Sequence, residues 1–285
     1  MRKSLALSLT LFMFLSMGTA AFADTSDVAD ASQMTTVQDV TEEGMVPVYA
    51  GSLEDGEYPV TVECSSSMFR IESAVLTVRD GAMSAVLTMS GKSYLYVCPG
   101  TAKEAASADE SAFVPFAENA DGAHTFTVPV EALDAPVSCA AYSKNKELWY
   151  DRSLLFRADS LPRSAFKDGF FTTASSLQLA DGRYLVEVKL AGGSGKARVQ
   201  SPAELSVKDG SCTARIGWSS KNYDYMKVEG EKILPVPNEE YAAFEIPVLC
   251  FDRPMAVIAD TVAMSEPHEI RYTLCFDSKS LEAAP

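Results

Sequence analysis

The side chains of this chain that could take part in chemistry are mostly tyrosine, methionine and serine rather than histidine. Only two histidines occur among the 285 residues, His124 and His268. The chain has no G-x-S-x-G nucleophile motif, and its six cysteines include no C-x-x-C pair of the kind that binds zinc. The stretch Gly192–Lys196 looks like a phosphate loop, but Ala197 stands where that motif needs serine or threonine. We therefore predict that the protein is not an enzyme.

Hydroxyl, thioether and aromatic side chains gather where strands are expected to end. An apolar slot faced by a phenol oxygen or a sulfur would suit a planar ligand. The alternative interpretation is ordinary packing, because tyrosine is a good strand former and alternate tyrosines of one strand share a face. The candidate binding residues are Ser65, Ser66, Ser67, Met68, Tyr142, Tyr150, Tyr223, Tyr225 and His268.

These candidates belong to a sequence pattern that occurs twice. Asp55–Val62 recurs as Asp181–Val188, and Leu76–Gly81 recurs as Leu205–Gly210. Later runs repeat in the same order, such as Phe126–Val130 and Phe244–Val248. The spacing of about 118 to 129 residues exceeds any solenoid repeat and matches a whole small domain.

Each copy has the pattern of short β-strands. From Tyr184 to Leu190 apolar and other side chains alternate with a period of two. Asp80-Gly81 and Asp209-Gly210 each separate two strand-like runs, which predicts hairpins. One helix is expected over 101–109, with no counterpart in the second copy. The fold predicted is all-β, with two tandem immunoglobulin-like β-sandwich domains.

The ends of these copies set the predicted domain boundaries. Residues 1–23 have two basic residues, an apolar run and an Ala-x-Ala site, which predicts a signal peptide and a secreted, extracellular protein, with cell-surface association as an option. Residues 24–50 hold six acids and no base, as in a disordered acidic linker. Repeat 1 then covers 51–161, an inter-domain bridge 162–179, and repeat 2 180–285.

The net charge and the positions of the cysteines limit which partners and which disulfides are expected. Loss of Arg2 and Lys3 with the leader would shift the net charge from −15 to −17, which disfavours nucleic acid as a partner. No later apolar run is long enough to span a membrane. Four cysteines, Cys139, Cys212, Cys250 and Cys275, align with apolar positions of the other copy, so we expect core packing rather than a disulfide framework, with one incidental disulfide as the alternative. His124 follows an Asp-Gly turn and is expected to be exposed.

The order of these motifs resembles the NEAT (near iron transporter) domains of Gram-positive surface proteins. The resemblance rests on Asp-Gly-x-Tyr-x-Val, then Ser-x-Met, then Leu-x-Val-x-Asp-Gly, then a late hairpin that ends in Leu-x-Phe. It implies immunoglobulin-like sandwiches, often in tandem, that bind haem between a serine-rich lip and the late hairpin. In that family a hairpin tyrosine binds the iron, and a second tyrosine four residues on supports it.

Carried onto this chain, the resemblance implies a partial haem site. Ser65–Met68 match the lip and Tyr150 matches the second hairpin tyrosine, but the iron-binding tyrosine falls on Lys146. Tyr142 could replace it only in a longer hairpin. In the second copy glycines around Gly193 replace the lip, and the hairpin offers Met264 and His268.

Two functions follow as expectations. The first is a secreted binding protein for haem or another porphyrin in iron acquisition, with repeat 1 as the better candidate. The second is an adhesion module that binds a host or surface protein or a glycan through tyrosine and tryptophan. The oligomeric state does not follow from the sequence.

Overall fold

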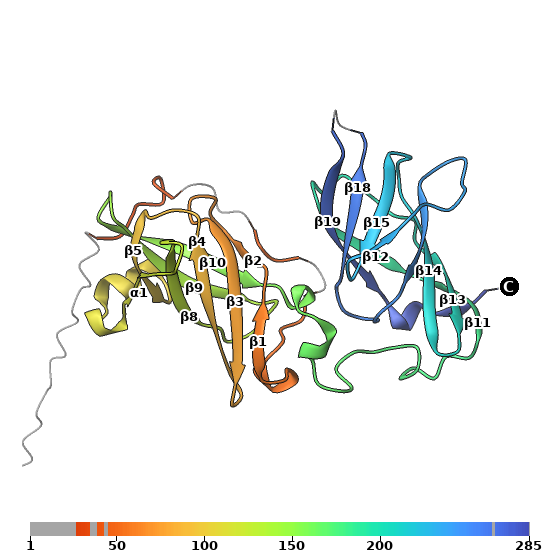
Figure 1. The fold of residues 1–285 in the computed structure, drawn as a ribbon, viewed down its shortest axis with the longest axis horizontal. Coiled ribbons are helices and arrows are strands. Elements are labelled where there is room, and N and C mark those ends of the chain that lie inside the picture. Colours follow the sequence, from red (N-terminus) through yellow and green to blue (C-terminus); the bar gives the residue numbers. More distant parts are fainter. Residues whose placement is uncertain (1–26, 35–38, 43–44, 264–265, 285) are drawn as a thin grey trace, which may run out of the picture.

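The computed structural model describes residues 27–34, 39–42, 45–263 and 266–284. The predicted signal peptide, residues 1–23, and Met264 lie outside these ranges. The fold is all-β, with 49% strand, 8% helix and four antiparallel sheets, which confirms the predicted class. No helix within the described ranges has the length and apolar character needed to cross a membrane. Figure 1 shows the sheets as two groups, called here the N-terminal half and the C-terminal half.

The N-terminal half contains two five-stranded antiparallel sheets, with strand orders β1-β3-β4-β8-β7 and β2-β10-β9-β5-β6. The strands are β1 (Gly56–Pro59), β2 (Val62–Cys64), β3 (Ile71–Arg79), β4 (Ala82–Met89), β5 (Tyr94–Pro99), β6 (Val114–Pro115), β7 (Ala117–Glu118), β8 (His124–Pro129), β9 (Pro136–Ser143) and β10 (Leu148–Phe156).

The C-terminal half has two further five-stranded sheets, with strand orders β17-β14-β13-β11-β20 and β12-β19-β18-β15-β16. Its strands are β11 (Gly182–Val186), β12 (Val188–Gly192), β13 (Ala203–Lys208), β14 (Ser211–Gly217), β15 (Tyr223–Val228), β16 (Glu231–Ile233), β17 (Ala243–Pro247), β18 (Met255–Thr261), β19 (His268–Phe276) and β20 (Glu282–Ala283).

Helices are few and short in the described ranges. The α-helix α1 (Ala102–Ser107) lies within the span predicted to be helical. Thr101 caps it: its side chain accepts a hydrogen bond from the backbone N–H of Glu104, whose carboxylate accepts one from the backbone of Thr101. The 3₁₀ helices are η1 (Ala50–Ser52), η2 (Glu110–Ala112), η3 (Ala158–Ser160), η4 (Arg163–Ala165) and η5 (Ser278–Ser280).

The two halves share a strand order. The run β1-β3-β4-β8 corresponds to β11-β13-β14-β17, and β2-β10-β9-β5-β6 corresponds to β12-β19-β18-β15-β16. Both Asp-Gly pairs form the predicted hairpin turns, with φ of 51° and 76° at Asp80-Gly81 and 50° and 74° at Asp209-Gly210. Two successive residues in this left-handed region are the mark of a type I′ turn.

One side-chain hydrogen bond also repeats between the halves, buried in the first and exposed in the second. The Oδ1 atom of Asp134 accepts from the backbone N–H of Ala158 at 2.8 Å, and Oδ1 of Asp252 accepts from that of Ser278 at the same distance. Both aspartates have positive φ, 53° and 61°. Aspartate tolerates this conformation because its short polar side chain can bond locally. The repeated sequence thus specifies repeated backbone geometry.

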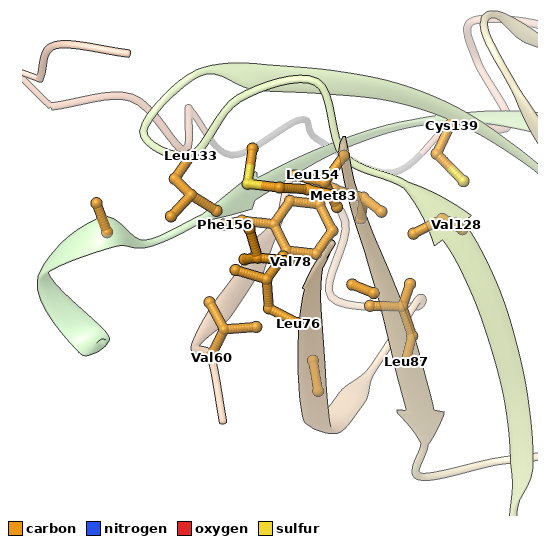
Figure 2. Packing of buried hydrophobic residues seen from close by; sticks show 14 of the residues in the cluster. Val60, Leu76, Val78, Met83, Leu87, Val128, Leu133, Cys139, Leu154 and Phe156 are labelled. Carbon is orange, nitrogen blue, oxygen red and sulfur yellow. The ribbon is translucent and has the colours of Figure 1, made fainter. Parts of the chain in front are cut away.

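A separate hydrophobic core fills the space between the two sheets of each half. Along β3 the buried side chains Ala74, Leu76 and Val78 alternate with less buried ones, as a strand with one face on a core requires. Figure 2 shows part of this core, in which Leu76 and Leu87 of one sheet and Leu154 and Phe156 of the other belong to one cluster. In the C-terminal half Leu205, Ile216, Leu274 and Phe276 do the same. Phe171, between the halves, packs against both clusters.

The acidic segment before β1, predicted as a linker, contacts the fold at several described points. Val28 forms a β-bridge with Trp149, and Val48 forms one with Leu133. Glu42 accepts hydrogen bonds from Nη2 of Arg157 at 3.1 Å and from the hydroxyl of Thr273 at 3.2 Å. Because Arg157 and Thr273 belong to different halves, Glu42 connects them. The Glu42 carboxylate thus pairs with the buried Arg157, which no sequence pattern had indicated.

Two further expectations concern single residue types. All six cysteines are unpaired. Of the four aligned with apolar positions, Cys139, Cys212 and Cys250 are buried as predicted, whereas Cys275 is only partly buried. His124, in contrast, was expected to be exposed, and this prediction is wrong. The residue is buried at the start of β8, where its ring stacks on Phe116 with the centroids 3.8 Å apart. Stacking on the ring of Phe116, rather than the position after the turn, accounts for the burial of His124.

Candidate functional site

The predicted serine-rich lip forms a tight turn directly after β2. Ser65 is buried, and its Oγ accepts a hydrogen bond from the backbone N–H of Ser153 on β10 at 2.9 Å. Ser66 is also buried, and its Oγ accepts from the N–H of Met68 at 3.3 Å. Ser67 is exposed, and the side chain of Met68 is 64% exposed. The two inner serines therefore hold the turn, and they leave the Met68 thioether in solvent.

Tyr150 lies near this lip, on the side of β10 that faces the core. Leu154 and Phe156 belong to the core cluster, and Arg152 and Tyr150 follow on the same side because strand side chains alternate. The guanidinium of Arg152 lies 5.1 Å from the centroid of the Tyr150 ring. Tyr150 is thus connected to the lip through Arg152, whose further contact leads to the carbonyl of Met68.

Arg152 and Tyr94 complete this group, and sequence analysis did not select either. Nη2 of Arg152 donates to the hydroxyl of Tyr94 at 3.0 Å, and that hydroxyl lies 3.5 Å from the carbonyl oxygen of Met68, to which it donates. Arg152 also lies over the Tyr94 ring, 5.8 Å from its centroid. We call Met68, Tyr94, Tyr150 and Arg152 the lip cluster. The signal for Arg152 was available, since it is the one charged residue in register with Tyr150, Leu154 and Phe156.

The charge of Arg152 is the least satisfied feature of the lip cluster. The residue is only 7% exposed, and its Nε has no hydrogen-bond partner among the described residues. Its Nη1 donates to the carbonyl of Asp151, and no carboxylate within the described ranges forms an ion pair with it. A buried cation is costly unless a negative group accompanies it. The lip cluster therefore has the electrostatics of a site for an anionic group.

Tyr142 does not join the lip cluster, because it lies on the opposite face of the same sheet. It pairs with Trp149 in register and packs with it against α1. The Tyr142 ring centroid lies 5.2 Å from that of Trp149 and 6.1 Å from that of Tyr96. With Phe113 these rings line a cavity of about 540 Å³, called here the aromatic hollow. Burial raises the pKa of Tyr142 above its ordinary value.

A β-bulge explains why the tyrosines of β5 separate. Tyr94 pairs with Ser143 and Tyr96 with Tyr142, so two residues of β5 advance while β9 advances by one. The shift breaks the alternation, and Tyr94 enters the core while Tyr96 lies on the face of the aromatic hollow. The expectation that alternate tyrosines share a face is wrong here. The same irregularity occurs between Tyr223 and Tyr225 of β15.

The C-terminal half replaces the cation of the lip cluster by a phenol. Tyr223 and Tyr272 hold the positions of Tyr94 and Arg152, and their hydroxyls lie 3.2 Å apart. Burial, followed by this hydrogen bond, raises the pKa of Tyr223 far above its ordinary value. Gly193 replaces the lip and closely approaches the ring of Tyr272: a Cβ there would lie 2.6 Å from Cε1. The equivalent site of this half is therefore neutral and filled by its own side chains.

Tyr225 and His268 lie outside this buried group. The hydroxyl of Tyr225 donates to Oε1 of Glu269 at 2.6 Å, a hydrogen bond that raises the pKa of Tyr225 to about 12. The ammonium of Lys232 lies 3.6 Å from the centroid of the Tyr225 ring. His268 is exposed at the start of β19, opposite Thr261. The structure thus brings neither residue together with Tyr223.

A haem group can be tested against these residues by its donor requirements. The iron of haem takes one or two axial ligands, for which methionine and tyrosine both serve. In the lip cluster the Met68 sulfur and the hydroxyls of Tyr94 and Tyr150 are such groups, that of Tyr94 already bonding Arg152 and the Met68 carbonyl, and Arg152 could pair with a propionate. Lys146, aligned with the family's usual ligand, is exposed in the β9–β10 turn. Within the described ranges no three His, Cys, Asp or Glu side chains form a metal-binding group.

The sequence was also compared with known proteins. No family model matches this chain, and a search of curated proteins finds no significant match.

Proposed function

We propose that this chain is a secreted, non-enzymatic binding protein whose N-terminal half binds a planar, anionic ligand of the porphyrin class, haem being the first candidate. Export is proposed from the N-terminal sequence alone. We further propose that the two halves are tandem immunoglobulin-like domains. Two facing antiparallel sheets in each half and the shared strand order support this proposal.

One observation carries the ligand proposal: the buried Arg152, which has no acidic partner among the described residues, lies between Tyr94 and Tyr150, beside the exposed Met68. A porphyrin would supply an interaction partner for each of these groups. Its propionates carry the negative charge for Arg152, and its flat apolar ring covers the exposed thioether. When haem is bound, its iron supplies a site for a sulfur or phenolate ligand. The C-terminal half, with Tyr272 in place of Arg152, lacks the cation.

Titration of the mature protein with hemin tests this proposal. We expect one equivalent to shift the Soret band, because an axial ligand from the protein changes the iron spectrum. Tyr150→Phe and Met68→Leu should each alter that spectrum or weaken binding about tenfold, since each removes one donor. An unshifted band with the wild-type protein would overturn the proposal.

Variants at the other candidate positions locate the site. Tyr142→Phe, on the opposite face, and His268→Ala, in the other half, should leave the hemin spectrum unchanged. Iron-free protoporphyrin IX separates the two contributions, because it retains the propionates but offers no metal to Met68 or Tyr150. Loss of the shift in Tyr142→Phe alone would move the site to the aromatic hollow.

The aromatic hollow supports a second candidate function, binding of a glycan or a surface protein. Tyr96 is 37% exposed there, and Tyr142 and Phe113 are half-buried, so their rings offer an apolar surface for stacking. Tyrosine and tryptophan are frequent anchors at protein interfaces. Glycan-array binding that Tyr96→Ala abolishes, with no response to hemin, would favour this function over the first.

A further inference from the structure

A second cavity, of about 550 Å³, lies between the two halves and shares no residue with the lip cluster. We call it the inter-half cleft. Its walls come from the linker around η4, from the loop that precedes β18 and from the end of the N-terminal half. In Figure 1 the linker is the green segment that joins the two groups of sheets. A volume of this size is typical of a site for a small organic molecule.

Three phenylalanines of the linker form the main apolar wall. The ring centroid of Phe166 lies 4.7 Å from that of Phe170 and 4.8 Å from that of Phe171, and the latter two lie 4.9 Å apart. Phe170 and Phe171 are each half-buried, so part of each ring remains open to the cleft. Met255 and Leu249 of the C-terminal half also line it. An apolar group could therefore lie in the cleft with protein on both sides.

Two arginines lie on these rings. The guanidinium carbon of Arg163 is 4.3 Å from the centroid of Phe171, and that of Arg253 is 4.1 Å from the centroid of Phe170. Arg163 also donates from Nη1 to the carbonyl oxygen of Leu249 at 2.9 Å. Arg253 forms no ion pair or hydrogen bond with any described residue, and its cation–π contact with Phe170 fixes where its N–H groups lie.

None of the acids that line the cleft forms an ion pair with Arg253, although its charge opposes the larger effect of burial on the pKa of Asp134. Asp159 is engaged by two other guanidiniums, those of Arg157 at 3.1 Å and Arg271 at 2.6 Å. Asp134 accepts from the backbone of Ala158, and burial raises its pKa to about 6. Glu229 is exposed. The cleft therefore combines apolar rings with one cation whose hydrogen-bond donors are free.

We propose that the inter-half cleft binds an apolar molecule with a single carboxylate, its hydrocarbon against the three phenylalanines and its carboxylate on Arg253. An amine fits less well, because each of the two half-buried rings, Phe170 and Phe171, already carries a guanidinium. A carboxylate forms paired, charge-assisted hydrogen bonds with a guanidinium, which fixes its orientation. An aliphatic and an aromatic acid share this chemistry.

Calorimetric titration with dodecanoate and with dodecylamine, below their micellar concentrations and at pH 7.5, tests the proposal. We expect dodecanoate to bind at one site per chain and dodecylamine to bind at least tenfold more weakly. Arg253→Gln should weaken dodecanoate about tenfold or more, as expected for loss of a charged hydrogen bond. Arg79→Gln, an exposed arginine of β3, makes the same charge change outside the cleft and should have no effect.

Hydrogen exchange locates the ligand without any variant. Dodecanoate should slow amide exchange in residues 161–171 and 249–256 and leave the lip, residues 65–68, unchanged. Equal binding of the amine and the acid, or protection confined to other segments, would overturn the proposal. The porphyrin proposal stands or falls separately: Arg253→Gln should keep the hemin spectrum, and Tyr150→Phe should keep dodecanoate binding.

Discussion

Arg152 donates a hydrogen bond to the hydroxyl of Tyr94 at 3.0 Å, whereas the residues at the same positions of the other half, Tyr272 and Tyr223, form a bond between two neutral phenols at 3.2 Å. The surrounding strands have the same order in both halves. The difference is therefore one of charge within a common backbone. The site in the N-terminal half therefore favours an anion, whereas in the C-terminal half the two phenols bond each other.

Replacement of Arg152 by methionine should retain or increase stability while it weakens hemin binding. The substitution removes a buried charge that pairs with no acid in the part of the chain that the structure describes, and it keeps most of the apolar stem. We expect the free energy of unfolding to rise by about 1 kcal/mol, as for other buried charges replaced by apolar residues. Urea denaturation measures it. A loss of more than about 2 kcal/mol would show that Arg152 serves the fold instead.

Asp134 should make stability depend on pH. Its folded pKa, raised to about 6 by burial, exceeds the unfolded value, so the folded state binds the extra proton between pH 4 and 6. Stability from this group is thus present at low pH and lost as pH rises through that window. Asp134→Asn should therefore exceed the wild type by about 2–3 kcal/mol at pH 7 and match it at pH 4.

The repeated fold supplies the control for this measurement. Asp252→Asn changes the equivalent aspartate, which has the same backbone conformation and hydrogen bond but is exposed. Because Asp252 is exposed, its replacement should not give the gain in stability at pH 7 that Asp134→Asn gives. An equal gain in both variants at pH 7 would contradict the assignment to burial.

Arg157→Gln should destabilise the protein strongly. The side chain is 2% exposed and bonds Glu42, Glu63 and Asp159 at 3.0 to 3.1 Å, so its removal leaves carboxylates without their cation. We expect a loss of about 3–5 kcal/mol in urea denaturation. Arg183→Gln is the control, because its pair with Glu204 is exposed and should contribute less than about 1 kcal/mol.

Gly193→Ala and Gly195→Ala should differ in cost. Both glycines have positive φ, 60° and 72°, so both variants incur backbone strain of about 1–2 kcal/mol. Only at Gly193 would the new Cβ meet the ring of Tyr272, while at Gly195 nothing lies within 4 Å. The first variant should therefore lose about 1 kcal/mol more in thermal or urea unfolding. Equal losses would mean that the Tyr272 ring moves freely.

Local sequence was sufficient for the turns and for the class of the fold. Asp80-Gly81 and Asp209-Gly210 specify their hairpins because both positions require positive φ. The helix near Thr101 was also predictable, since the capping threonine and Glu104 are close in sequence. Such features depend on neighbouring residues, and each repeated copy provides independent evidence for them.

The candidate site was less predictable, because it depends on which face of a sheet each side chain occupies. The bulge between Tyr94 and Tyr96 reverses the alternation of β5, and no residue of that strand marks it. Tyr142 and Tyr150 flank one turn in the sequence yet lie on opposite faces. Arg152 could have been found from its register with Leu154. The burial of His124 could not, since its partner Phe116 lies in the link between β6 and β7, outside the turn that precedes His124.

Phe171 packs against the hydrophobic clusters of both halves. Any truncation that ends the first half before this residue, or begins the second half after it, takes an aromatic ring from a core and exposes apolar surface. The two copies are thus no longer interchangeable units that recombination could move separately. The linker that contains Phe171 contributes to the interior of both halves. A half transferred to another protein would therefore need this linker to keep its core complete.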